Sequence, residues 1–158
     1  MALEVYSALT DLATTLSDNW AAAVTAKSAT VSTPSGYTVI EPGLTRLPQS
    51  GFPQVLIVPA GRGQRIPITH ESSSPLVRWE LPVRIWVGLS DSSGSVSTAQ
   101  ASAADHLQIV DYILTTNRPS SSTEGGAGRF GGFGKFETEQ GTIWGAHYDL
   151  TLTVRPIY

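Results

Sequence analysis

The chain contains three histidines, the residue type best suited to proton transfer and metal binding near neutral pH. His147 and Asp149 are two positions apart in an alternating segment, so they share one side of a predicted strand. This pair would serve a metal ion or a proton relay only if a third ligand came from elsewhere. The sequence marks no such ligand, and we predict no metal site.

The other two histidines are typical of structural positions. His70 lies in a polar segment beside Glu71, which indicates a surface side chain. His106 lies within the apolar arc of a predicted helix, so we expect it to be partly buried and hydrogen-bonded. Its neighbour Asp105 cannot face it, because successive helical residues point in different directions.

Gly126, Gly128 and Gly131 formally match the pattern Gly-x-Gly-x-x-Gly. A dinucleotide site needs a strand before this pattern and a helix after it, so that phosphate meets the helix N-terminus. Here a serine-rich segment precedes it and a predicted strand follows, so we reject that interpretation. The sequence also lacks a nucleophile elbow, a Walker loop, a zinc-protease helix and any cysteine. We therefore predict no catalytic residue and no cofactor.

Two long alternating segments would position these side chains. Apolar residues take every second position in residues 76–89, and residues 144–154 repeat the pattern. A period of two predicts strands with one buried face. Pro82 lacks an amide hydrogen, which indicates either an edge strand or an amide that faces away from a neighbour at that point. The two strands predict a sheet with one packed face and one face that is wet or used for contact.

Residues 3–26 and 99–116 have the three- and four-residue spacing of amphipathic helices. Glu4, Asp11 and Asp18 lie roughly opposite the first apolar stripe. They form either a solvated face or an acidic surface that lines the path of something negatively charged. The apolar stripes are Val5, Leu9, Leu12, Leu16, Trp20 and Ala23 in the first helix, and Ala103, Leu107, Ile109, Val110, Ile113 and Leu114 in the second.

Short strands are predicted at residues 37–40 and 54–58, the second of them central in the sheet because it is continuously apolar. Serine, glycine and proline predict flexible loops at about 60–75, with an exposed excursion at 66–70, and at about 119–135. We therefore expect one domain over residues 1–158. Its predicted fold class is α+β, with two amphipathic helices on one face of a single, largely antiparallel sheet and with extended loops.

Composition narrows the classes of partner. The net charge is −3, so the chain lacks the positive surface potential that dominates nucleic-acid affinity. Specific DNA or RNA binding is therefore disfavoured. Charged residues are 15% of the chain, below the roughly 25% of average domains, which favours extensive subunit contacts. No segment resembles a membrane span or a signal peptide, so we expect a soluble protein without a membrane partner.

The order and size of these elements resemble those of the tail terminator, or tail completion, proteins of long-tailed bacteriophages. The resemblance covers nearly the whole chain and is one of hydrophobic pattern and element order. It is carried by the opening helix around Leu9, Leu12, Leu16 and Trp20, and by residues 52–57, 78–87, 104–110 and 148–154.

The resemblance implies a virion protein of the tail or neck, assembled in the host cytoplasm. Such proteins form a hexameric ring that ends the tail tube, and the implied partners are the tail tube protein and the head-tail connector protein. DNA would pass through the channel without specific binding. Six chains would carry a formal charge of six times −3, or −18, which suits a channel through which a polyanion slides.

Two alternatives remain open at this point: a head-completion or connector protein of the neck, with a ring of higher order, and a small-molecule binding module or enzyme. The second alternative would use Trp79, Trp86 and Trp144 as an aromatic pocket. Trp86 lies opposite the apolar face that holds Trp79, which favours Trp86 for a subunit contact. The candidate subunit or partner contacts are Arg62, Arg65, Arg78, Arg84, Trp86, Arg129, Phe130 and Phe133.

Overall fold

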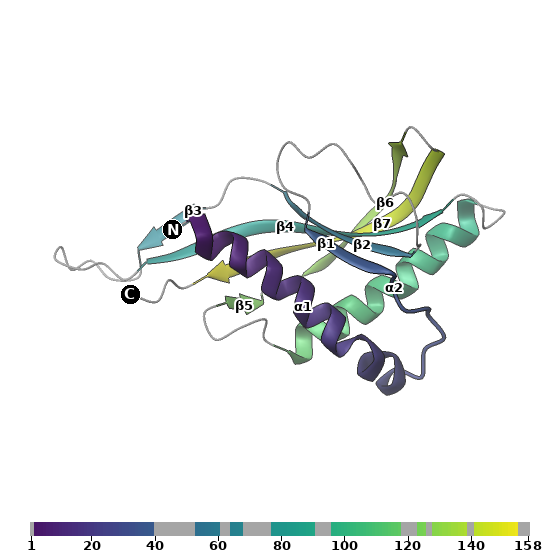
Figure 1. The fold of residues 1–158 in the computed structure, drawn as a ribbon, viewed down its shortest axis with the longest axis horizontal. Coiled ribbons are helices and arrows are strands. Elements are labelled where there is room, and N and C mark those ends of the chain that lie inside the picture. The colour runs from purple at the N-terminus through teal and green to yellow at the C-terminus, as the bar shows by residue number, and fades with distance from the viewer. Residues whose placement is uncertain are drawn as a thin grey trace.

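A computed structural model describes residues 2–39, 53–60, 64–67, 77–90, 96–117, 123–125, 128–138 and 141–154. This part of the chain forms two helices and one seven-stranded sheet (Figure 1). In chain order the elements are α1 (Ala2–Ala26), β1 (Gly36–Val39), β2 (Gln54–Pro59), β3 (Gln64–Pro67), β4 (Val77–Ser90), α2 (Val96–Thr116), β5 (Thr123–Gly125), β6 (Arg129–Thr138) and β7 (Gly141–Val154).

The seven strands form five rows. β2 and β3 pair with the same side of β4, and β5 and β6 pair with the outer side of β7. β1 runs parallel to β2, and the other pairings are antiparallel. Both helices lie on one side of this sheet (Figure 1). The predicted α+β fold with a largely antiparallel sheet is therefore confirmed.

β4 and β7 pair with each other in the middle of the sheet, and each has one buried face, as their alternating sequences predict. Val83 lies opposite Leu150, and Ile85 lies opposite Tyr148. These side chains point toward the helices and are at most 5% exposed. Because the helical stripes and the alternating strands both bury their apolar sides, they meet in one core. The helical side chains in this core include Leu12, Leu16 and Trp20 from α1, and Ile109, Val110 and Ile113 from α2.

The structure decides between the two alternatives for Pro82. β4 is internal, so the edge-strand alternative is wrong. β2 pairs with β4 only as far as Val83, and β3 pairs with it only from Glu80, so Pro82 lies at the break between them. The Pro82 carbonyl accepts a hydrogen bond from the Ala60 amide at 2.9 Å on this side. In an antiparallel strand the N and C=O of one residue point the same way. The Pro82 nitrogen therefore also faces the break between β2 and β3, where no strand residue needs an N–H from it.

Three strands lie where the sequence predicted flexible loops, and this corrects the prediction. β3 lies within residues 60–75, and β5 and much of β6 lie within residues 119–135. Their sequences have weak strand propensity, but each pairs with a 14-residue strand, β4 or β7. Strand formation depends more on such neighbours than on local propensity. The remaining residues of the two predicted loops lie mostly outside the described part.

Candidate functional site

The glycine-rich strand β6 brings together several predicted contact residues and forms one border of the sheet. Within the described chain, β6 pairs only with β7. Phe130 lies opposite Tyr148 and Phe133 lies opposite Ala146, so both phenylalanines belong to the helix-covered face. Residues three apart would normally point to opposite faces. A register shift between Phe130 and Gly132 inserts one extra residue, and this bulge places both rings on the same face.

Glycine is required in β6 because the strand lies close to side chains of its neighbours. A β-carbon on Gly131 would collide with the His147 ring and the Asp149 carboxylate. A β-carbon on Gly134 would lie 2.7 Å from the Trp86 ring. The backbone of β6 therefore packs directly against three side chains on the face away from the helices.

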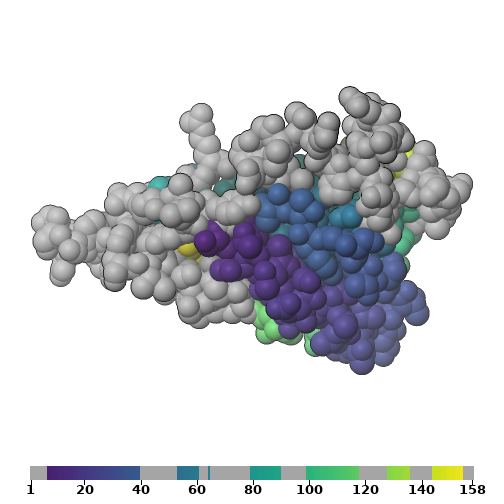
Figure 2. All heavy atoms as spheres, in the orientation of Figure 1, coloured from purple at the N-terminus to yellow at the C-terminus, as the bar shows by residue number. Residues whose placement is uncertain are grey.

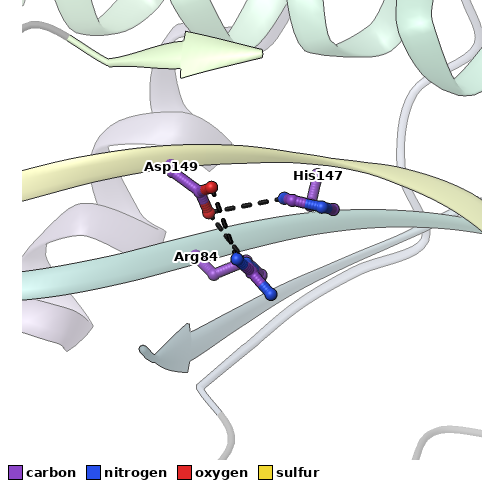
Figure 3. A network of polar contacts seen from close by, with 3 residues as sticks. All are labelled: Arg84, His147 and Asp149. Carbon is purple, nitrogen blue, oxygen red and sulfur yellow. Dashed lines mark hydrogen bonds and ion pairs between the residues drawn. The ribbon is translucent and has the colours of Figure 1, made fainter. Parts of the chain in front are cut away.

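That face carries a polar network across β4 and β7 (Figure 3). The Arg84 Nε donates to Asp149 Oδ1 at 2.8 Å, and a terminal guanidinium nitrogen lies 3.4 Å from Oδ2. The His147 Nδ1 lies 3.4 Å from the same Oδ1, and the His147 ring centroid lies 4.6 Å from that of Trp86. The Arg84 hydrogen bond holds the pKa of Asp149 below its usual range, although partial burial opposes this shift.

The chemistry of this network is that of a cross-strand contact. The third group beside His147 and Asp149 is Arg84, a cation, which would oppose binding of a metal ion. In the part of the chain that the structure describes, no three His, Asp or Glu side chains converge as metal ligands. The backbone of Gly131 also lies against the His147 ring. The network therefore joins β4, β7 and β6 and fixes their register.

The opposite side of β6 has an apolar surface. Phe130 and Phe133 are 50% and 51% exposed, and their ring centroids lie 5.2 Å apart in an edge-to-face arrangement. They line a groove of about 990 Å³, and residues of α2 and of the segment after α1 form its other walls. Exposed phenylalanines at the border of a sheet are typical of a surface that is covered in an assembly.

Polar contacts lie along this groove. The Tyr148 hydroxyl donates to Asp111 Oδ1 at 2.6 Å, linking β7 to α2. Burial, together with the Asp111 carboxylate, raises the pKa of Tyr148 above its usual value. The Lys27 Nζ lies 4.9 Å from the centre of the Tyr112 ring, where a cation–π contact joins the segment after α1 to α2.

The structure separates the three tryptophans of the aromatic-pocket alternative. Trp79 pairs with Val154 at one end of the sheet, and Trp144 pairs with Leu89 at the other. Ten positions along β4 separate these pairs, which corresponds to roughly 33 Å. Trp86 points to the other face of the sheet, so these tryptophans do not share a pocket.

Most of the remaining candidate residues have side chains outside the described part of the chain. Asp18 is exposed on α1 and Asp11 is half-buried there, whereas the side chain of Glu4 lies outside the described set. Arg65 and Arg78 lie in β3 and β4, but their side chains are likewise not described. Two further candidates, Arg62 and His70, lie outside the described residues.

His106 has the buried, hydrogen-bonded position that its place in the apolar arc predicts. It is 1% exposed, and its Nδ1 lies 2.7 Å from the Ser102 carbonyl oxygen within α2. Its Nε2 lies 3.1 Å from the Ser32 carbonyl oxygen. His106 therefore joins α2 to the segment that follows α1.

Sequence reasoning missed the Arg84–Asp149 pair and the Tyr148–Asp111 hydrogen bond. The alternation did place Arg84 and Asp149 on the polar sides of their strands. Pairing them also required the register between β4 and β7, which no single segment carries.

No protein-family model matches this chain, and comparison with curated proteins also found no match. Among the described residues, neither helix is long and apolar enough to cross a membrane.

Proposed function

We propose that this chain is a structural subunit of a bacteriophage virion, a tail terminator that forms a ring at the end of the tail tube. The ring joins the tube to the head connector and leaves a channel for DNA. The observation that carries the proposal is the pair Phe130 and Phe133, half-exposed on a strand at the border of the sheet.

The placement of this pair favours self-assembly over a role in folding. The β-bulge in β6 directs both rings to one side, where half of each residue stays in contact with solvent. Burying two such rings against a partner would contribute several kcal/mol, on the scale of about 25 cal/mol per Å² of apolar area. An assembly protein needs such a surface.

The assignment to a phage tail is supported by the resemblance of sequence pattern and element order, with which the α+β fold agrees. The net charge of −3 per chain also suits a ring around passing DNA, because a negative channel does not retain a polyanion. These features favour an assembly role over catalysis, and we propose that the chain is not an enzyme.

The test is the size of the particle formed by the purified chain with and without tail tubes. Multi-angle light scattering and class averages from electron microscopy should show a six-membered ring, in solution or at tube ends. A chain that stays monomeric and does not bind tube ends would contradict the proposal. A ring with more than six subunits would instead favour a connector protein of the neck.

A further inference from the structure

We infer that adjacent copies in the ring join head to tail, with the outer border of β6 in one copy packed against the outer surface of α1 in the next. This inference rests on the proposed ring and names the two surfaces that close it. It also gives Asp11 and Asp18 a role at the subunit contact in place of the channel.

The two surfaces belong to elements that pack on different rows of the sheet. α1 packs on β1, the first row of the sheet, and on α2. α2 packs on β4 and β7 and also reaches β6, in the last row. A closed ring needs two different surfaces that face apart, because each subunit contacts one neighbour through each of them.

The two surfaces have opposite charge. α1 contains the acids Glu4, Asp11 and Asp18 and has no lysine or arginine. The stretch of β6 from Arg129 to Lys135 contains these two cations and no acid, and both side chains are exposed. Within the described residues, neither Asp18 nor Arg129 forms an ion pair. A contact between the two surfaces would bring Asp18 of one copy near Arg129 of the next, and so pair two charges of opposite sign.

The shapes of the two surfaces also match. The outer side of α1 carries small side chains, and α1 forms part of the face seen in Figure 2. Small side chains let the rings of Phe130 and Phe133 approach the helix closely. The exposed small residues of α1 include Ser7, Thr10, Thr14, Ser17 and Ala21.

Charge also argues against the simplest alternative, a two-fold contact of β6 with β6. That arrangement would bring Arg129 and Lys135 near the same cations of the second copy, and such like charges repel. The head-to-tail contact avoids this repulsion and places both phenylalanines against α1, where the exposed side chains described after residue 6 are small apart from Asp18. The occupant that fits the β6 border is therefore a second copy of this chain.

Reversing the charges tests the contact directly. One variant carries Arg129→Glu and Lys135→Glu, so that both of its surfaces are acidic. The other carries Asp11→Lys and Asp18→Lys, so that its β6 border and the described part of α1 are basic. Each variant alone should need a protein concentration at least about tenfold higher to form the ring.

An equimolar mixture of the two variants should recover ring formation to within about threefold of the wild-type concentration. The two variants then alternate around the ring, so that every contact joins an acidic surface to a basic one. A ring of six subunits allows this alternation because six is an even number. Thermal unfolding of each variant checks that it is folded, and Thr151→Lys, on the sheet face away from the helices, serves as the matched control of charge. Phe130→Ser combined with Phe133→Ser should prevent ring formation in every mixture.

The outcomes separate this inference from the proposed function. Wild-type chain that forms no ring, alone or on tail tubes, would overturn the function and the inference together. Two outcomes would overturn only the inference. In the first, the wild-type chain forms rings and the charge-reversed variants form them equally well. In the second, the variants fail alone and their equimolar mixture also forms no rings. Phenylalanine variants that form rings but no longer bind tube ends would assign β6 to the tail tube and also overturn it.

Discussion

The same two strands, β4 and β7, present two faces with different requirements. On the helix-covered face, Val83, Ile85 and Leu150 are buried among apolar groups. On the other face, Arg84 and Asp149 are partly exposed and held by specific contacts. The first face is stabilised by apolar side chains that fill the space between the sheet and the helices. The second face is stabilised by the Arg84–Asp149 pair, by the contact between the Trp86 and His147 rings, and by the close approach of Gly131 and Gly134 in β6.

The fold and the proposed assembly surface therefore depend on different parts of the molecule. The packed face contributes most of the stability, because the free energy gained on folding is roughly proportional to the apolar area that is buried. The polar contacts on the opposite face fix the register between the strands, and β6 provides an exposed border of the sheet. Substitutions on the two faces should therefore differ in size and in their dependence on pH.

The largest effect is expected on the packed face. Ile85→Ala should lower the free energy of unfolding by about 2–5 kcal/mol, because it leaves a cavity where a fully buried side chain was. Urea denaturation measures this change. Thr151→Ala, an exposed position of β7 on the other face, should change it by no more than about 0.5 kcal/mol. Equal losses for the two variants would contradict the assignment of faces.

The next effect concerns the close approach of β6. Gly134→Ala should cost about 1–3 kcal/mol, because the added carbon would lie 2.7 Å from the Trp86 ring. In a Trp86→Ala background the same change should cost much less, and a double-mutant cycle measures this coupling. Strictly additive losses would show that the ring and the strand do not meet.

A smaller effect is expected where a polar group borders the packed face. Tyr148→Phe removes the 2.6 Å hydrogen bond to Asp111 and should cost about 1 kcal/mol, because Asp111 is exposed to water. Tyr112→Phe is the matched control, since its ring keeps the contact with Lys27. Denaturation of both variants in parallel should show the larger loss for Tyr148→Phe. A larger loss for Tyr112→Phe would contradict the geometry of this contact.

The smallest effect belongs to the polar network and depends on pH. Asp149→Asn should cost about 0.2–1 kcal/mol at pH 7, because the Arg84 side chain is 40% exposed. Arg84 lowers the pKa of Asp149 in the folded state, so the carboxylate stabilises the protein above its unfolded pKa of about 3.9. This contribution is lost as pH falls through the folded pKa.

Unfolding by urea at pH 7, 5 and 3 measures this dependence. The difference between wild type and Asp149→Asn should shrink toward the lowest pH. Asp18→Asn, on the exposed side of α1, is the control and should change stability less at pH 7. A difference for Asp149→Asn that grows on acidification would contradict the direction of the pKa shift.

Much of the fold could be predicted from the sequence because periodicity reports burial locally. The stripes of α1 and α2 and the alternation of β4 and β7 each lie within one segment, and each element formed where its pattern indicated. β3, β5 and β6 could not be predicted in this way. Their strand structure comes from pairing with β4 and β7, which a local pattern does not contain.

The candidate contact residues divide along the same line. Residue type singled out Arg84, Trp86, Phe130 and Phe133, and for Trp86 its side of the alternating segment also counted. Which surface each one joins was decided by tertiary structure. Arg84 meets Asp149 across 65 positions of sequence through the β4–β7 register, and one extra residue in β6 places both phenylalanines on one face. Local sequence determines which side of an element is apolar, whereas register and bulges depend on how distant strands pair.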